Sequence, residues 1–264
     1  MSDAFDPWSV LSEHQQRVAR AFLAERAAER AHVVIYLSGA HAYGFPSPDS
    51  DLDLKCIHVA PTDQLVGLDP SEGGRELTVV TEGVELDYSS NELGGALRGA
   101  IKGNGNFLER FLGELALGGD AELRAGARAI VQPLLSRRLA AHYRGFATSQ
   151  LRAFDDAPTA KRALYVIRTA ATGRHALAHG EIVTDVARLA PFVPAELDEL
   201  LAIKRTGERS PLPPELAAAW RKRLVGAIAA IETSARESIL PPEPPADALA
   251  AADAWLREIR RTHW

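Results

Sequence analysis

The chain of 264 residues contains a single cysteine, Cys56. One cysteine cannot form an internal disulfide bond or supply a thiolate zinc site, so the fold does not depend on an oxidising compartment. No apolar run approaches the ~18 residues of a membrane span. The N-terminus, MSDAFDPWSV, carries acids where a signal peptide carries Lys or Arg. We therefore expect a cytoplasmic protein with no membrane partner.

An excess of basic residues is also absent, since the formal net charge is -5. This charge excludes a uniformly basic, sequence-blind nucleic-acid binder. The two parts of the chain differ, however. Residues 1–123 hold 9 Lys and Arg against 20 Asp and Glu, a net charge of -11, whereas residues 124–264 hold 21 against 15, a net charge of +6. An acidic first half and a basic second half remain compatible with an enzyme that binds one end of a nucleic acid.

The residue pattern changes near the middle of the chain. Short β-branched segments between Gly, Pro, Ser and Asp clusters predict strands at residues 32–37, 52–59, 76–81 and 84–88. Beyond about residue 120, long segments with helical spacing predict helices at residues 121–132, 133–154, 159–180, 194–205, 214–238 and 245–261. We therefore expect an α/β (α+β) domain at residues 1–118 and an all-helical domain at residues 119–264.

The segment SGAHAYGFPSPDSDLDL, residues 38–54, concentrates the chemistry of the first domain. Alternate residues of a strand point to the same face, so Asp51 and Asp53 converge while Leu52 enters the core. Two such close carboxylates repel each other unless a cation lies between them. Mg²⁺ prefers hard oxygen ligands of this kind.

A third carboxylate is expected from a neighbouring strand. Asp87 in VELDY is the first choice, and Glu85 on the same face is the reserve. Three carboxylates can hold two metal ions for in-line nucleotidyl transfer. If residues 40–44 begin a helix after the turn at Gly39, its free N–H groups provide a site for phosphates.

These residues resemble a known pattern: Gly39 to Gly44, then Asp49 to Leu54, then Asp87. This order is similar to that of the DNA polymerase β nucleotidyltransferase superfamily, and most similar to the RNA-repair-pathway polymerase-β-type predicted nucleotidyltransferases. The segments Lys102–Asn106 and Leu108–Glu109 add to the resemblance, although Gly105 stands where that family usually has Pro. The resemblance covers about residues 32–112 and extends more weakly to about residue 182.

The resemblance implies a mixed-sheet nucleotidyltransferase palm followed by a helical domain. It also implies the transfer of NMP from an NTP, ATP or CTP, to a hydroxyl acceptor, with release of pyrophosphate and with Mg²⁺ or Mn²⁺ as cofactor. The expected acceptor is an RNA end, for example of a tRNA. Asp51 and Asp53 would hold both metal ions, and Asp87 would bind the catalytic ion and accept the proton of the attacking hydroxyl.

Residues that would contact the nucleotide are expected in both domains. On the palm they are Ser38, Gly39, Ala40, Tyr43 and Ser50. Ala40 replaces the superfamily's usual Ser, which predicts that the triphosphate binds more weakly by ~1–2 kcal/mol.

The helical domain is expected to supply positive charge for the triphosphate. Lys161 and Arg168 lie on one predicted helix face together with Tyr165. A solvated amphipathic helix face would give the same pattern.

Two other interpretations remain open at the level of sequence. The same chemistry serves small-molecule or protein adenylyltransferases, including AMPylating antitoxins. Alternatively, Arg174 and His179 resemble the Arg and His of HEPN-type RNases in toxin–antitoxin systems, although they also suit a basic helix end before Gly180. The base preference, the acceptor and the oligomeric state are not fixed by these residues.

Overall fold

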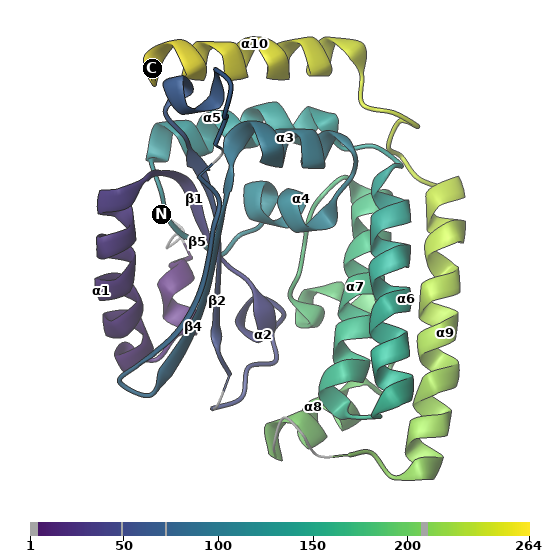
Figure 1. Cartoon of the computed structure of the whole chain (residues 1–264). Helices are drawn as coiled ribbons and strands as arrows, with labels where there is room; N and C mark the ends of the chain where they lie inside the picture. Colours follow the sequence, from purple (N-terminus) through teal and green to yellow (C-terminus); the bar gives the residue numbers. More distant parts are fainter. Residues whose placement is uncertain (1–4, 49, 72, 207–210) are drawn as a thin grey trace.

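The computed structural model describes residues 5–48, 50–71, 73–206 and 211–264. A mixed five-stranded sheet forms its centre, in the order β3-β4-β2-β1-β5 (Figure 1). β2 and β4 are parallel, and the other neighbouring pairs are antiparallel. The strands are β1 Ala31–Leu37, β2 Leu52–Val59, β3 Arg75–Thr81, β4 Val84–Glu92 and β5 Ala116–Gly118. The four predicted strands are confirmed, whereas β5 has three residues and was too short for its pattern to predict it.

Ten α-helices surround the sheet in the described part of the chain. The helices are α1 Glu13–Glu29, α2 Gly39–Ala42, α3 Leu93–Ile101, α4 Gly105–Leu112, α5 Ala121–Val131, α6 Leu139–Asp156, α7 Ala160–His179, α8 Leu197–Thr206, α9 Pro214–Arg236 and α10 Ala246–Thr262. None of these described helices combines the length and apolarity required to cross a bilayer. The predicted fold class, a mixed sheet followed by helices, is confirmed.

Helix ends follow local sequence signals. Ser12 caps α1 through a reciprocal capping box with Gln15. Thr159 caps the start of α7, and Gly180 ends that helix in the left-handed conformation with φ +69°. The helix predicted from residue 133 begins later, at Leu139, because Pro133 belongs to a short 3₁₀ turn that precedes it.

The helices form distinct layers around the sheet (Figure 1). α1 lies on one face, where the ring of Phe22 packs against Tyr88 of β4. α6, α7 and α9 pack together on the side of the opposite face. α10 returns to α3 and α5, next to the sheet. Thr62 anchors the end of α10, since its N–H and hydroxyl donate to the carbonyls of His263 and Arg260.

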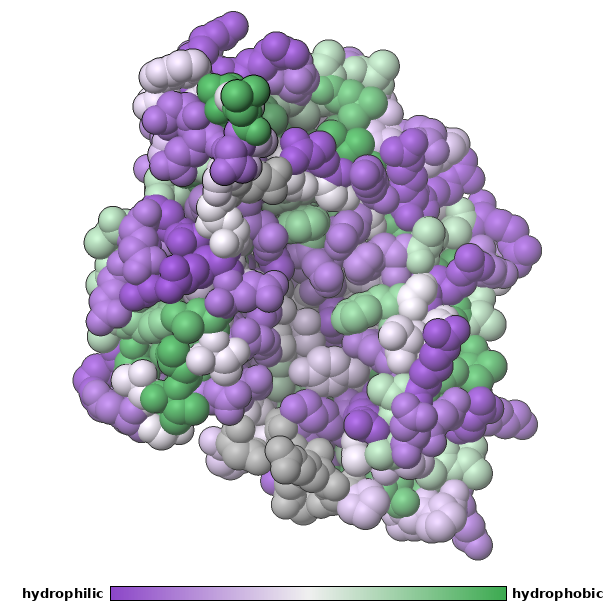
Figure 2. Space-filling view, viewed as in Figure 1, coloured by the Kyte–Doolittle hydropathy of each residue, from purple (hydrophilic) through white to green (hydrophobic). Residues whose placement is uncertain are grey.

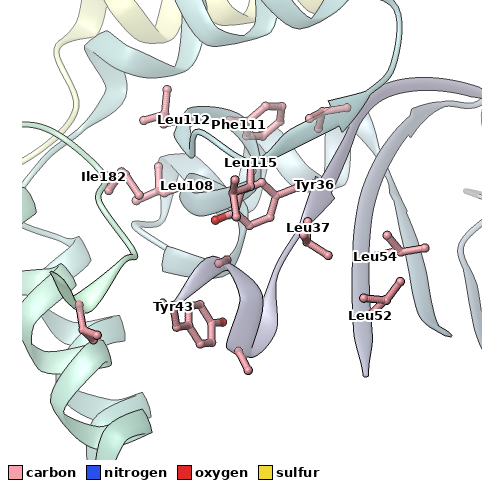
Figure 3. Close-up of a cluster of buried hydrophobic side chains, with 14 of the residues drawn as sticks. Tyr36, Leu37, Tyr43, Leu52, Leu54, Leu108, Phe111, Leu112, Leu115 and Ile182 are labelled. Atoms are coloured by element: carbon pink, nitrogen blue, oxygen red, sulfur yellow. The ribbon is translucent and has the colours of Figure 1, made fainter. Parts of the chain in front are cut away.

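Part of the hydrophobic core lies between the sheet and α4. Figure 3 shows Tyr36 of β1 surrounded by side chains of α4 and of the segments at Leu115 and Ile182. Leu52 and Leu54 of β2 are fully buried, and they alternate with Asp53. The alternation fixes which face of β2 presents polar side chains.

Candidate active site

The structure brings Asp53 and Asp87 together at the centre of the sheet. They are register partners on the parallel strands β2 and β4, so their side chains share a face. Asp51 directly precedes β2. Asp49, which belongs to the motif in the sequence, lies outside the described residues.

Lys55 supplies the cation between the two strands. Its Nζ lies 2.8 Å from Asp87 Oδ2 and 3.5 Å from Asp53 Oδ1. Sequence reasoning missed this lysine, although its place two residues after Asp53 on a strand puts both side chains on one face. Lys55 therefore offsets part of the repulsion between the carboxylates.

Asp53 has the most strongly perturbed carboxylate of the site. Burial raises its pKa to about 6, and the neighbouring negative charge of Asp51 adds to the shift. Asp87 acts in the same direction, while Lys55 opposes it. Burial together with the charges of Asp51 and Asp87 therefore outweighs the opposing effect of Lys55 on Asp53.

Gly39 is the residue that allows the turn after β1 to touch Asp53. Its φ is +66°, and a Cβ at this position would lie 1.8 Å from Asp53 Oδ2. The N–H of Ser38 also donates to the Asp53 carbonyl at 2.8 Å. Only glycine satisfies both the backbone conformation and the close approach.

The turn continues into α2, a single helical turn. The side chain of Ala40 is a buried methyl group, which has no hydrogen-bond donor. The hydroxyl of Ser38 lies 3.2 Å from that of Tyr43. Tyr43 is itself buried, and its ring packs edge-on against Tyr165 of α7. Tyr43 thus packs behind the turn.

Ser50 closes the loop that leads to the carboxylates. Its hydroxyl accepts from the N–H of Ser47 at 2.9 Å, and its own N–H donates to the Ser47 carbonyl. Lys204 of α8 donates to the Ser47 hydroxyl at 2.6 Å and is 1% exposed. This buried lysine joins the helical part of the chain to the loop, and no local signal in the sequence marked it.

Arg168, which we expect to contact the triphosphate, lies in the interior of the protein. It is 1% exposed and pairs with Glu109 of α4 at 2.7 Å. Its guanidinium also lies 3.6 Å from the centre of the Tyr43 ring. The hydroxyl of Tyr143 donates to the same Glu109 carboxylate. In this arrangement Arg168 supports the turn from behind and presents no charge to solvent.

Lys161 lies at a pocket between α6 and α7 with a volume of about 560 Å³. Tyr165, one turn further along α7, lines the same pocket. Burial raises the pKa of Tyr165, and the negative charges of Asp53 and Asp51 contribute. Tyr165 thus lines the Lys161 pocket and packs against Tyr43 of the glycine turn. Figure 2 shows the molecule hollowed between its sheet half and its helical half.

Arg174 and His179 are occupied by packing against a loop. Arg174 donates to the Phe192 carbonyl at 3.0 Å, and its guanidinium lies over the Phe192 ring. The rings of His175 and His179 are 4.6 Å apart, and both contact Phe192. These contacts attach the 3₁₀ segment Val186–Phe192 to α7.

The carboxylates suit a divalent cation by their chemistry. Carboxylate oxygens are the ligands that Mg²⁺ prefers, and Asp53 and Asp87 already share one positive group, Lys55. Within residues 5–48, 50–71, 73–206 and 211–264, no three His, Cys, Asp or Glu side chains stand close enough to form a complete metal site. A metal ion held by all three aspartates would therefore require these side chains to draw closer and Lys55 to move.

Comparisons with known proteins agree with the motif. Residues 15–258 match the model of the RNA repair pathway DNA polymerase beta family. The uncharacterized protein MJ0002 of Methanocaldococcus jannaschii is 26% identical over 155 residues, which are 58% of this chain and 63% of that protein. This chain thus matches less than two thirds of that relative.

A solved structure was also found. The nucleotidyltransferase-like protein from Exiguobacterium sibiricum 255-15 is 11% identical, with a TM-score of 0.34, over 93% of this chain and 79% of that chain. The family match covers most of the sequence and confirms the resemblance seen in the motif. The chain therefore belongs to the RNA repair pathway DNA polymerase beta family, a group of polymerase-β-type nucleotidyltransferases.

Proposed function

We propose that this protein transfers NMP from an NTP to a hydroxyl of an RNA end and releases pyrophosphate. The observation that carries the proposal is the contact of Gly39 with Asp53 beside Asp87. It joins a glycine turn, suited to phosphate, to paired carboxylates, suited to metal ions, at one point of the sheet.

The nucleotide approaches from the side of β1. The backbone amides of the turn at Gly39 and Ala40, together with Ser38, contact the triphosphate. Lys161 supplies positive charge from α7, and ATP or CTP is the expected donor. Arg168 positions Tyr43 behind the turn, as its buried ion pair with Glu109 indicates.

Asp51, Asp53 and Asp87 would hold Mg²⁺ or Mn²⁺, which supplies charge neutralisation on the triphosphate and lowers the pKa of the attacking hydroxyl. Asp87 accepts the proton of that hydroxyl. The hydroxyl oxygen forms a bond to the α-phosphorus, and the bond between this phosphorus and pyrophosphate breaks. Lys55 releases Asp87 before the proton is accepted, because its ammonium otherwise holds the same carboxylate.

An RNA acceptor is supported by the family description and by the distribution of charge. The family belongs to an RNA repair pathway. The second half of the chain carries a net charge of +6, which favours contact with a phosphate backbone, whereas the first half is acidic.

A labelling screen tests this function. The protein is incubated with each α-³²P-labelled NTP, Mg²⁺ and total RNA, beside the Asp51→Ala/Asp53→Ala double variant. The proposal predicts label on RNA that the double variant loses. Label on protein alone would indicate AMPylation, label on small molecules would indicate a small-molecule acceptor, and no label with any NTP would contradict nucleotidyl transfer to these acceptors.

A further inference from the structure

A polar groove continues from Asp87 toward the edge of the sheet. Its volume is about 450 Å³, within the ~300–1,000 Å³ range of ligand sites. We call it the acceptor groove and define it by its polar lining: Lys55, Glu76, Thr78, Asp87, Ser89 and Arg110.

The strand register arranges the floor of the acceptor groove in two rows. Thr78 of β3 pairs with Asp87 of β4, which pairs with Asp53 of β2. In the next row, Glu76 pairs with Ser89, which pairs with Lys55. Paired residues of neighbouring strands share a face, so the row that contains Glu76 lies directly beside the row of the carboxylates.

Arg110 of α4 lies at the other side of the acceptor groove. Its Nη1 donates to Asn91 Oδ1 at 2.5 Å and to the Cys56 carbonyl at 3.3 Å. Its guanidinium also lies 5.2 Å from the centre of the Phe107 ring. These contacts hold the guanidinium in place at the groove wall, where a planar pair of donors suits a phosphate.

The acceptor groove and the glycine turn lie on opposite sides of the carboxylates. The strand order is β3-β4-β2-β1, and Gly39 follows β1 while Glu76 and Thr78 belong to β3. A triphosphate at the turn leaves the groove open. A second substrate that brings a hydroxyl to Asp87 therefore has its own approach.

The lining of the acceptor groove matches one kind of second substrate. Arg110 and Lys55 suit a phosphate, whereas the exposed carboxylate of Glu76 and the hydroxyl of Ser89 suit sugar hydroxyls. A ribonucleotide presents both groups together. A deoxynucleotide lacks the 2′-hydroxyl and leaves one acceptor of the groove without its donor.

We propose that the acceptor groove holds the terminal nucleotide of the acceptor strand and that Glu76 recognises its ribose 2′-hydroxyl, so that RNA ends are selected over DNA ends. This inference rests on the proposed nucleotidyl transfer. It adds a subsite and names the residue that determines specificity within it.

Two fluorescent oligonucleotides that differ only in a 2′-hydroxyl on the last nucleotide test the inference. Their binding is measured by anisotropy with the wild-type protein, with Glu76→Ala, and with Glu122→Ala as control, an exposed glutamate of α5 outside the groove. The wild type and the control should bind the ribo end about tenfold more tightly, the effect of one hydrogen bond to a charged group. Glu76→Ala should bind both ends alike.

The same pair of oligonucleotides is then offered with a labelled NTP and Mg²⁺. Labelling of both ends at equal efficiency by the wild type would overturn the inference and leave the proposed function intact. An unchanged ribo preference in Glu76→Ala, or a preference for the deoxy end, would also overturn it. If the protein neither binds nor labels either oligonucleotide, the result would contradict both proposals.

Arg110→Gln provides a second measurement. It should weaken the binding of both oligonucleotides equally and reduce the salt dependence of binding, because a phosphate contact carries no information about the sugar. Thermal unfolding of this variant first establishes that it folds. A loss confined to the ribo end would contradict the role given to Arg110.

Discussion

At the scale of single residues, Gly39 is the most constrained position of the site. Gly39→Ala would place a Cβ 1.8 Å from Asp53 Oδ2 at a φ of +66°. We expect loss of nucleotidyl transfer and a free energy of unfolding lower by at least ~1–2 kcal/mol, the cost of left-handed backbone for a non-glycine residue. Urea denaturation and the labelling assay measure the two effects.

Gly83→Ala is the matched control for Gly39→Ala. Gly83 has a φ of +79°, but no heavy atom lies within 4 Å of the point that its Cβ would occupy. Gly83→Ala should lower the free energy of unfolding by the same ~1–2 kcal/mol for left-handed backbone, and it should retain activity. Equal loss of activity in both variants would show that backbone strain, and not the contact with Asp53, explains the result.

Lys55 occupies the space between two carboxylates that a metal ion would share. Lys55→Met should therefore bind Mn²⁺ more tightly, about tenfold or more, because no ammonium competes for Asp87. Electron paramagnetic resonance of free Mn²⁺ measures this affinity without any substrate. The exposed Lys102→Met serves as control, and a weaker affinity in Lys55→Met would show that the ammonium assists metal binding.

The amino-acid sequence predicts part of the candidate site. The alternation of Asp51, Leu52 and Asp53 predicted a shared polar face, and the register places Asp87 beside Asp53 on that face. Lys55 and Lys204 were missed. Lys55 has the right spacing but an ordinary strand position, whereas Lys204 reaches Ser47 from a helix about 150 residues away, a contact that only tertiary structure creates.

At the scale of secondary-structure elements, a buried ion pair joins α4 to α7. Arg168 and Glu109 are 1% and 5% exposed and 2.7 Å apart. Glu109→Gln leaves the arginine charge buried without a counter-charge, so we expect a loss of ~3–5 kcal/mol in the free energy of unfolding. Urea denaturation measures this loss.

The double variant Glu109→Gln/Arg168→Met provides the control for this pair. Removal of both charges should recover part of the stability lost in Glu109→Gln, because no unpaired charge remains buried. A loss in Glu109→Gln below ~1 kcal/mol would show that solvent reaches the pair and that it does not stabilise the contact between α4 and α7.

Helical spacing in the sequence predicted α7 and correctly placed Lys161, Tyr165 and Arg168 along it. Helical spacing could not show that these three side chains have different surroundings in the folded protein. Arg168 faces Glu109, a residue of a helix that forms from a different part of the chain, so its burial follows from packing between elements. Periodicity reports a face of a helix and not what covers that face.

At the scale of the whole molecule, stability should depend on pH through His32. Its ring hydrogen-bonds the Tyr88 hydroxyl, and burial lowers its pKa to about 4 from an ordinary value of 6.5. The unfolded chain therefore takes up this proton between pH 6.5 and 4, while the folded protein does not. The free energy of unfolding therefore decreases as the pH falls from 6.5 toward 4, and His32 causes no such decrease above pH 6.5.

Thermal unfolding between pH 7 and pH 4.5 checks this sign. His32→Gln keeps polar groups next to Tyr88 but does not titrate, so its midpoint should fall less steeply with pH than that of the wild type. The raised pKa of Asp53 acts in the opposite direction in both proteins and cancels in the comparison. Parallel curves for the two proteins would contradict the assignment to His32.

The net charge of the whole chain conceals its division into an acidic half with the carboxylates and a basic half.

The most direct test of nucleotidyl transfer compares RNA labelling from α-³²P and γ-³²P NTP in the presence of Mg²⁺, with wild type and with Asp87→Asn. The account predicts the α label on RNA, the γ label in pyrophosphate, and a rate lower by about 10²–10⁴ in the variant, as expected for loss of a proton acceptor. Transfer of the γ label to RNA, or an unchanged rate in Asp87→Asn, would contradict it.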